Sequence, residues 1–520
     1  MQKTISIKVL PSEASDNQLL TQIIAKACAV PAKQVTGFNL QKQSIDARGR
    51  QAWFHLTIEV FINEPFRPTP LLPLQLRDVS RAAKTVVIVG AGPAGLFAAL
   101  RLIELGIKPV ILERGKDVRS RRRDLAAINK EGVVNTESNY CFGEGGAGTY
   151  SDGKLYTRST KRGDIFRILS ALVHFGATEA ILYQAHPHIG TNKLPQIITS
   201  MREKIIEYGG EVRFEKKLTA LIVEKETVTG VHTADGDSLH ADAVILATGH
   251  SARDIFLMLH AAGIRIEAKP FALGVRVEHP QPLIDTIQYH CPTRSIHLPP
   301  AAYSLVQQVN GKGVFSFCMC PGGIIAPAAT SKGEIVVNGW SPSKRNNPYA
   351  NSGIVVSVEE KDTQAFKKHG PLAAMYFQQS VEQKAFEAGG GSLAAPAQRL
   401  EDFSRGIVSA SLPDCSYLPG IRSADLGSVL PSFVHRSLQE AFVAFGKKMK
   451  GYFTNEAVVV ATESRTSSPV RIPRDTERLE HPQVKRLYPC GEGAGYAGGI
   501  VSAAMDGEKV AEAIARVLSL

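Results

Sequence analysis

The chain has 520 residues, of which 44% are apolar and 21% are charged, a composition typical of a soluble protein with two or three domains. It has no run of the roughly 18 apolar residues that a membrane helix needs, and its alternating first residues predict a strand rather than a signal peptide, so we expect a cytoplasmic protein. The net charge of +11 is spread along the chain, which favours solvated helix faces over a nucleic-acid surface and leaves an anionic substrate or coenzyme as the alternative.

The N-terminal residues 1–62 predict a small α+β module. Alternating apolar residues indicate a strand at 5–10, a helical pattern follows at 17–28, and strand-like runs lie around 35–43 and 52–61. Four prolines then fall within residues 65–73, which is typical of a stiff connector.

The segment that follows predicts a dinucleotide site. The apolar strand 85–89 meets the glycine turn Gly90–Gly95 and then a helix. Gly90 permits the sharp turn, Gly92 lets backbone amides approach a pyrophosphate, and Gly95 lets the helix pack closely on the sheet. The next apolar run stops at Glu113, where a carboxylate would meet an adenosine ribose. The GxGxxG spacing recurs at 143–148 and 493–498, but neither copy has both the preceding strand and the later acidic residue.

Further along the chain, strand and helix patterns alternate to about residue 263. Runs at 211–214, 218–224 and 230–232 predict a meander, and the buried strand 243–247 ends at Thr248 and Gly249. Short strands punctuated by proline and glycine then predict an inserted domain. The expected organisation is a module at 1–62, a linker at 63–82, a nucleotide-binding domain at 83–263, an inserted substrate or cap domain at 264–431, and a return to the nucleotide domain at 432–520.

The seven cysteines are scattered and include no CxxC pair, so we expect neither a metal site nor a disulfide scaffold. Cys318 and Cys320 are the closest pair. The favoured interpretation is a strand with alternating cysteines, and a redox role is the alternative.

Four segments next to strands have the glycine or polar content that an enclosed cofactor needs. In 141–155 the glycines allow backbone to lie flat against a ligand, and Ser151 and Lys154 could donate to phosphate or to a cofactor carbonyl. The Thr248–Gly249 turn lets backbone pass close to a nucleotide. The loop 463–471 could hold an anionic substrate through its two arginines, or could be an exposed polar loop. In 487–507, a strand runs into Gly491 and Glu492 and a helix opens near Gly499.

This set of motifs resembles the FAD-binding fold of glutathione-reductase-type flavoproteins. More narrowly, segments 44–48, 145–155, 248–254, 320–323 and 463–469 resemble a bacterial family of FAD-dependent dehydrogenases whose substrate is unassigned, and the resemblance spans nearly the whole chain. It implies an α/β fold: a three-layer, Rossmann-like FAD-binding domain with a β-meander, an inserted α+β substrate or cap domain, and the small N-terminal α+β module.

The resemblance also implies which residues touch the cofactor. The pyrophosphate, adenosine and flavin portions are expected at Gly90, Gly92, Pro93, Ala94, Gly95, Glu113, Arg114, Gly148, Ser151, Gly153, Lys154, Leu218, Thr248, Gly249, Gly491, Glu492, Gly498, Gly499 and Ile500. Glu492 departs from the broader class, which usually has aspartate there. Relatives with covalent flavin use a histidine in the second glycine segment, and 139–155 contains none, so we expect non-covalent FAD.

For the reaction, we expect hydride transfer between a small organic substrate, possibly anionic, and FAD. The candidate catalytic residues are His250, Arg253, Arg465 and Lys154, with Cys320 a weaker candidate. The CxxxxC pair of disulfide reductases is absent, which disfavours that activity. NAD(P)H is a possible electron donor, through a non-standard site such as the arginines at 119–123. The alternatives are a tRNA-modifying flavoprotein, although no RNA-binding module is recognisable, and a non-catalytic flavin-bearing binding or sensor protein with 1–62 as its interaction arm.

Overall fold

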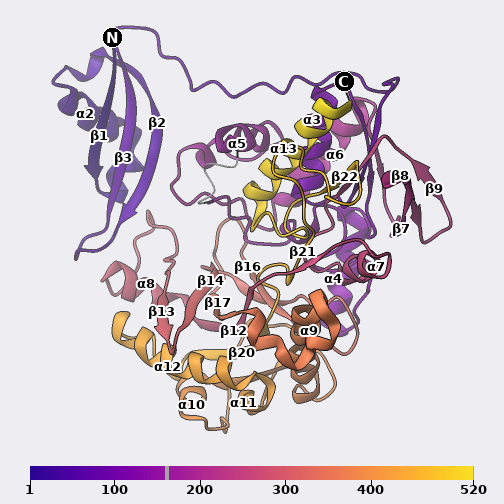
Figure 1. Cartoon of the computed structure of the whole chain (residues 1–520). Helices are drawn as coiled ribbons and strands as arrows, with labels where there is room; N and C mark the ends of the chain where they lie inside the picture. The colour runs from indigo at the N-terminus through magenta and orange to yellow at the C-terminus, as the bar shows by residue number, and fades with distance from the viewer. Residues whose placement is uncertain (158–162, 519–520) are drawn as a thin grey trace.

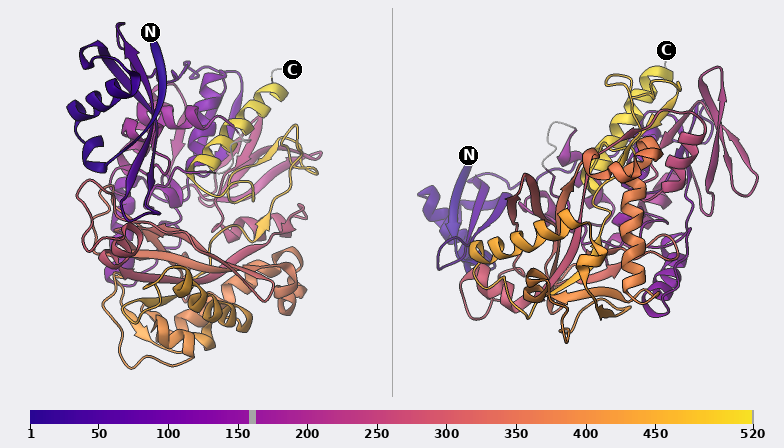
Figure 2. Two further views of the ribbon diagram at one scale, coloured as in Figure 1. Left: turned by 90° about the vertical axis from the view of Figure 1, so that its left-hand side faces the viewer. Right: turned by 60° about the horizontal axis from the view of Figure 1, so that its bottom comes forward.

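The computed structural model describes residues 1–157 and 163–518. Figure 1 shows the N-terminal module to one side, an α/β part built on a parallel sheet above, and a part built on a larger sheet below. The left view in Figure 2 keeps the same vertical order of the last two parts. Among the described residues, no helix has both the length and the apolarity required to cross a bilayer.

The N-terminal module is a β-sheet covered by a helix. β1 (Gln2–Val9) and β2 (Val35–Asp46) both pair antiparallel with the central β3 (Trp53–Ile62). Leu20 and Ile24 of α2 (Asn17–Cys28) are buried with Leu56 and Ile58 of β3, which fixes the helix on the sheet. The connector 63–84 contains no helix or strand and runs along the top of Figure 1.

The parallel sheet has the strand order β22-β10-β4-β5-β6, and every neighbouring pair is parallel. Its strands are β4 (Thr85–Val89), β5 (Lys108–Leu112), β6 (Glu211–Arg213), β10 (Ala243–Leu246) and β22 (Leu487–Pro489). Their residues alternate between two cores: Val86 and Ile88 face one, while Val87 and Val89 face the other. Such a sheet must be covered on both sides.

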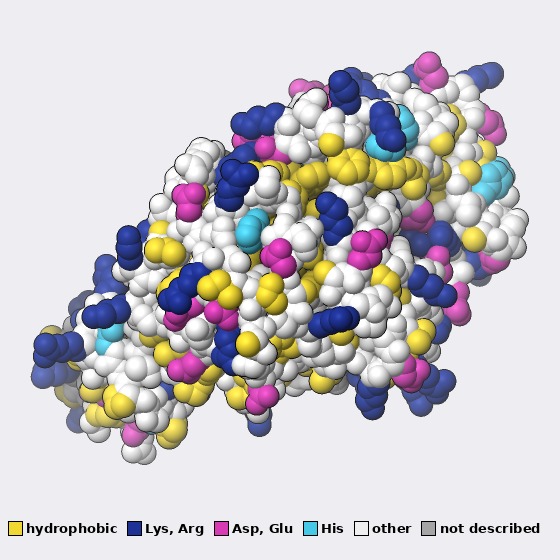
Figure 3. Space-filling model, turned by 90° about the horizontal axis from the view of Figure 1, so that it is seen from below, with side chains coloured by type: hydrophobic (Ala, Val, Ile, Leu, Met, Phe, Trp, Pro, Cys, Tyr) yellow, Lys and Arg dark blue, Asp and Glu magenta, His cyan; other side chains and the backbone are white. Residues whose placement is uncertain are grey.

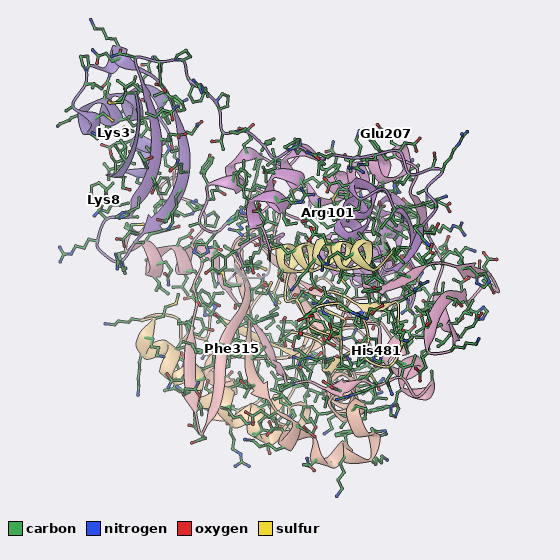
Figure 4. All side chains as sticks on the ribbon, turned by 45° about the horizontal axis from the view of Figure 1, so that its top comes forward. Lys3, Lys8, Arg101, Glu207, Phe315 and His481 are labelled. Atoms are coloured by element: carbon green, nitrogen blue, oxygen red, sulfur yellow. The ribbon has the colours of Figure 1, made fainter. Side chains whose placement is uncertain are left out.

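The helical layer contains α3 (Pro93–Glu104), α5 (Ile165–His174), α6 (Leu194–Glu207) and α13 (Ile500–Leu518). Arg101, labelled in Figure 4 beside the C-terminal helix, pairs with Glu512 of α13 at 2.9 Å. The opposite layer holds the antiparallel β7 (Leu218–Glu224), β8 (Thr227–Thr233) and β9 (Ser238–His240), with α7 (Arg253–Ala261). The expected meander is therefore present, but the prediction for 211–214 was wrong, because β6 is the edge strand of the parallel sheet and β9 completes the meander.

The large sheet is mostly antiparallel and has the order β13-β14-β17-β12-β20-β18-β19. Its strands are β12 (Phe271–Pro280), β13 (Val306–Val309), β14 (Lys312–Cys320), β17 (Tyr349–Val358), β18 (Ala395–Arg399), β19 (Ile421–Ser423) and β20 (Val458–Glu463). Leu438 and Phe442 of α12 (Ser432–Lys448) lie in the same buried cluster as Val275 and Val277 of β12. This helix therefore covers the sheet.

The other helices and strands of the described residues lie between these elements along the chain. They are α1 (Pro11–Ala14), η1 (Ala32–Gln34), α4 (Val118–Lys130), η2 (Gly146–Gly148), η4 (Glu179–Leu182), β11 (Glu267–Ala268), α8 (Gln281–Tyr289), β15 (Ile324–Pro327), β16 (Val337–Trp340), η5 (Glu360–Leu372), α9 (Ala373–Ala388), α10 (Leu400–Arg405), α11 (Leu426–Val429) and β21 (Val470–Arg471).

The return to the nucleotide-binding part lies later in the chain than expected. We expected it at residue 432, but β20 pairs antiparallel with both β12 and β18 inside the large sheet, and α12 covers that sheet. The chain rejoins the parallel sheet only at β22. The apolar pattern of β20 indicates a buried strand, and this pattern alone does not say which sheet the strand enters.

Candidate functional site

A cavity of about 380 Å³ lies at the carboxyl ends of the parallel strands, where the large sheet faces them. Ligands of doubly wound sheets bind at this edge, and the volume suits a small-molecule or cofactor site. On the side of the parallel sheet, the walls come from the glycine turn after β4, residues 112–114 at the end of β5, the loop 141–156, residues 216–218, the turn after β10, and the segment from β22 to the start of α13. Residues 317–318 and 338, and the loop residues 465–466, close the cavity from the side of the large sheet.

The first glycine turn has the conformation that the sequence predicts. Gly90 has φ +109°, and a Cβ there would lie 2.3 Å from the Ala247 carbonyl oxygen. A Cβ on Gly95 would lie 2.0 Å from the Gly90 oxygen, so glycine is required for α3 to sit against β4. By contrast, a Cβ on Gly92 would meet no described atom within 4 Å, because Gly92 faces the cavity.

The start of α3 is arranged to receive an anion. Among the described residues, no side chain caps the helix at Gly92, so backbone N–H groups of the first turn remain available. These groups and the positive end of the helix dipole favour a phosphate at this position. The start of α13 at Ile500 borders the same cavity. Two helix N-termini therefore face one ligand space.

Glu113 is held rigidly at the cavity wall. Its carboxylate accepts backbone N–H bonds from Ala91, Gly115 and Gly143, each at 2.9 Å. It thereby ties the first glycine turn to the loop that carries the second. Arg114 is oriented by ion pairs with Glu137 at 2.6 Å and Asp254 at 2.8 Å.

The second glycine segment is supported from behind by Arg121. This side chain is fully buried and donates to the carbonyl oxygens of Asn139, Glu144 and Gly146 at 2.8, 2.8 and 3.0 Å. Arg121 therefore anchors the cavity loop and is not available to bind a nicotinamide nucleotide, as the prediction for the arginines at 119–123 would require.

At the other end of the cavity lie Gly491 and Glu492, which follow β22. Gly491 has φ +73° and donates its N–H to Asp506 at 2.8 Å, while Arg474 pairs with the same carboxylate at 2.6 Å. These bonds fix the turn against α13. Burial raises the pKa of Glu492 to about 7.

His250 and Glu492 form a close pair in this part of the cavity, with His250 Nε2 3.7 Å from Glu492 Oε2. Burial, reinforced by the charges of Arg465 and Lys269, lowers the pKa of His250 to about 4. The imidazole is therefore neutral at neutral pH and presents a hydrogen-bond acceptor.

Arg253 and Arg465 belong to a buried ion-pair cluster. Arg253 contacts Glu334 at 3.2 Å and Glu382 at 2.9 Å, and Arg465 contacts the same two carboxylates at 3.1 and 3.0 Å. Burial alone would raise the pKa of Glu382, but the two guanidinium groups outweigh this effect and lower that pKa to about 2. Two positive and two negative charges compensate each other, so neither arginine is a free anion-binding group.

This cluster corrects part of the catalytic prediction. Arg465 does border the cavity, whereas the Arg253 side chain is directed to the cluster and does not line it. Arg253 opens α7, and its neighbours Ala252 and Asp254 line the cavity instead. The sequence predicts that Arg253 lies at the start of a helix, but it does not predict whether its side chain faces the cavity or the neighbouring carboxylates.

Cys320 is also displaced from the site. It is fully buried and does not line the cavity, whereas Cys318 does. The alternation expected for a strand is broken by a bulge, because Phe317 pairs with Gly353 while Cys320 pairs with Asn351. Lys154, in contrast, lines the cavity as expected and donates to the Met319 carbonyl.

With these exceptions the structure gathers the predicted site residues around one cavity. Every expected cofactor-binding residue lines it apart from Gly95, which packs beneath it, and so do His250, Lys154 and Arg465. The sequence prediction did not single out Asn338 of β16, Lys216 and Lys217 before β7, or Thr466. No glycine motif marks Asn338 or the two lysines, while Thr466 lies inside a segment that was predicted as a whole.

The residues fit a dinucleotide. Two helix N-termini, a glycine that leaves open space at the first of them and a carboxylate fixed by three backbone amides supply what a pyrophosphate and a ribose require. On the face shown in Figure 3, Lys and Arg side chains are interspersed with Asp and Glu, as on an ordinary solvated surface.

Comparisons with known proteins agree on the cofactor. Residues 83–253 match the family described as FAD binding domain, residues 270–466 match the one described as FAD-dependent protein, C-terminal domain-like, and residues 1–61 match a domain of unknown function. An uncharacterized protein of Clostridium beijerinckii is 39% identical over 520 residues, covering 96% of each chain. Monooxygenase 1 of Arabidopsis thaliana is 29% identical over 171 residues, which are 32% of this chain and 38% of that protein.

Among solved structures, the flavin-dependent brominase Bmp2 aligns with 84% of this chain and 79% of its own, at 13% identity and a TM-score of 0.37.

Proposed function

Because the chain belongs to the family of its Clostridium beijerinckii relative and carries FAD-binding and FAD-dependent domains, we propose that it is an oxidoreductase that passes hydride between a small organic substrate and non-covalently bound FAD. FAD is the cofactor. Once bound, it supplies the hydride and electron chemistry, and the chain supplies binding, orientation and electrostatics.

The adenosine and pyrophosphate portions would be held by the parallel-sheet part. The first turn of α3 would bind the pyrophosphate, Glu113 the ribose, and the backbone at Leu218 the adenine. Gly491, Glu492 and the start of α13 would hold the flavin portion, where the helix dipole stabilises negative charge. All of these groups border the same cavity, which supports the assignment.

The observation that carries the proposal is the set of polar groups where the large sheet closes the cavity. His250, Lys154, Asn338 and Thr466 all border it there, and they come from segments far apart in the chain. A neutral His250 can accept a proton or a hydrogen bond from a substrate hydroxyl or amine, and Lys154 provides positive charge. Because Arg465 is already compensated by Glu334 and Glu382, the substrate is better described as small and polar than as anionic.

A monooxygenase is the second candidate, favoured by the similarity of the FAD-binding part to Monooxygenase 1 of Arabidopsis thaliana. The two functions differ in what reduces the flavin. A dehydrogenase substrate bleaches the flavin without oxygen and without another reductant, whereas a monooxygenase needs a separate electron donor and consumes oxygen.

The test is anaerobic titration of the holoprotein with a panel of alcohols, amines, hydroxy acids, NADH and NADPH, followed by flavin absorbance. We expect an organic compound to bleach the flavin by itself. His250→Gln should keep the FAD content and slow bleaching by about 10²-fold or more, while His260→Gln, at an exposed position of α7, should leave the rate unchanged. If only NADH or NADPH bleaches the flavin, and oxygen uptake then requires an organic substrate, the monooxygenase is correct.

A further inference from the structure

The tripeptide Cys318–Cys320 lies at the end of β14, against the flavin side of the cavity. Cys318 lines the cavity and Cys320 is fully buried behind it. Cys318 shares the cavity wall with Gly491 and Glu492, two of the residues that are proposed to hold the flavin.

The backbone around Cys318 is strained. Cys318 has φ +48°, a left-handed conformation that few residues other than glycine adopt. The bulge places Cys318 and Met319 opposite Ser352 alone, between the pairs Phe317–Gly353 and Cys320–Asn351. Backbone strain of this kind tends to cluster at functional sites.

Their spacing along the chain keeps the two cysteines close to bridging range. Even in a fully extended chain, residues two positions apart are separated by at most about 7 Å. Disulfides form across Cα separations of about 4.4–6.8 Å. The Cys320 Sγ lies 3.2 Å from the Cys318 carbonyl oxygen, so the Cys320 side chain is turned back toward Cys318.

Two cations surround the tripeptide. The buried Arg276 donates to the Cys318 carbonyl at 2.6 Å and contacts Cys320 Sγ at 3.6 Å, and Lys154 donates to the Met319 carbonyl. A hydrogen bond from the Cys320 thiol, with the charges of Lys154 and Arg276, holds the pKa of Cys318 well below its usual range. That same hydrogen bond, together with burial, raises the pKa of Cys320. A cavity-lining cysteine with a lowered pKa, next to a buried thiol, is the arrangement of a reactive dithiol.

We propose that Cys318 and Cys320 form a redox-active dithiol–disulfide pair that exchanges two electrons with the bound FAD. In the oxidising direction, both S–H bonds break, an S–S bond forms between the two sulfurs, two protons are released from the thiols and two electrons pass to oxidised FAD. Bound FAD would serve as the two-electron acceptor. In the reverse direction, the S–S bond breaks as it receives two electrons, which bound reduced FAD would supply, and each sulfur gains a proton.

This proposal rests on the proposed function only through the presence of FAD, and it requires no organic substrate. It also explains how a chain without the CxxxxC motif next to its first glycine turn could still couple thiols to a flavin, because the pair enters the cavity from the large sheet instead. The predicted alternation of cysteines along a strand gave no reason to favour this role.

The test is anaerobic dithionite titration of the air-oxidised holoprotein. The wild type should take up four electron equivalents per FAD, two for the flavin and two for the disulfide. Cys318→Ser and Cys320→Ser should each take up two, and the control Cys291→Ser, at a half-buried cysteine in another loop, should take up four. Uptake of two equivalents by the wild type, or of four by Cys320→Ser, would overturn the proposal.

A second readout needs no flavin turnover. In this test, wild-type holoprotein is oxidised with ferricyanide and then denatured in iodoacetamide. The peptide that contains residues 318–320 should be unalkylated and lighter by two hydrogens. Treatment with dithionite before denaturation should restore two alkylation sites. Two free thiols after oxidation would refute the pair even if the serine variants fail to fold. A failure to find any organic substrate would leave both readouts unaffected, so the two proposals fail separately.

Discussion

Gly95 shows how closely a single residue of the glycine turn is fitted to its place. A Cβ added to Gly95 would point at the Gly90 carbonyl. It would lie 2.0 Å from that backbone oxygen and 3.2 Å from Ile88 Cγ2. The sequence motif predicted this role because the constraint is local: strand, turn and helix are consecutive in the chain. The side-chain directions of Arg253 and Cys320 were not predictable in the same way, since partners far along the chain determine them.

Gly95→Ala is expected to destabilise the protein by about 1–3 kcal/mol or more, because the backbone oxygen cannot move aside without separating α3 from β4. Denaturant unfolding of the apoprotein measures this change. Gly49→Ala, where a Cβ would meet nothing within 4 Å, should change stability by less than about 0.5 kcal/mol. Equal stabilities of the two variants would show that the turn is looser than described.

Arg465→Leu should cost about 3–5 kcal/mol, because it leaves Glu334 and Glu382 buried with one cation fewer. The matched change Arg405→Leu removes an exposed ion pair with Glu401 and should cost less than about 0.5 kcal/mol. Unfolding midpoints of the two variants decide the matter. If Arg465→Leu retains wild-type stability and loses only substrate binding, the arginine is a substrate ligand after all.

Glu492 should make the apoprotein's stability depend on pH in a defined direction. Burial raises its pKa from an ordinary value near 4.5 to about 7, so its contribution is present below about pH 4.5 and is lost as the pH rises through 7. The free energy of unfolding of the wild type, minus that of Glu492→Gln, should therefore fall across this window, while other titrating groups cancel in the difference. A difference that stays constant or rises with pH would contradict the burial of this carboxyl group.

At the scale of elements, the strands β4, β5, β10 and β22 and the helices α3 and α13 follow the predicted segments closely. Each of these strands is a short apolar run buried on both faces, which is a strong pattern in the sequence. The errors fell where the pattern is ambiguous. β6 is only half-buried and was assigned to the meander, and the bulge in β14 moved Cys318 rather than Cys320 to the cavity. A bulge depends on pairing with β17, which the residues of β14 alone do not encode.

The contact between α3 and α13 supports both helix starts at the cavity, and Gly507 of α13 packs tightly against α3 within it. A Cβ on Gly507 would lie 2.1 Å from the Ala94 oxygen and 3.1 Å from the Ala98 nitrogen. Gly507→Ala should therefore lower stability by about 1–3 kcal/mol and weaken FAD binding, because it displaces the two N-termini together. Thermal unfolding and FAD titration measure both effects, with the exposed Lys509→Ala as control. Unchanged FAD affinity would show that the helix starts are positioned independently.

At the scale of the whole molecule, the cavity is a product of two sheets that the chain visits alternately. The cofactor side was largely predictable, since most of its contacts belong to local motifs, with Lys216 and Lys217 as exceptions. The opposite side is assembled from β14, β16 and the loop after β20. That loop lies more than a hundred residues beyond the two strands, and only tertiary pairing brings the three together. The boundary expected at residue 431 failed for the same reason, because β20 joins the large sheet through β12 and β18.

Titration of the apoprotein with FAD, followed by flavin fluorescence, tests most directly the central claim that this cavity holds the cofactor with its pyrophosphate at the start of α3. The wild type should bind one FAD per chain and release it completely in acid. Gly92→Ala places a methyl group in the open space at this helix start and should weaken binding at least about tenfold, which corresponds to about 1.4 kcal/mol. A protein that takes up no FAD, or a Gly92→Ala variant that binds FAD as tightly as the wild type, would contradict the account.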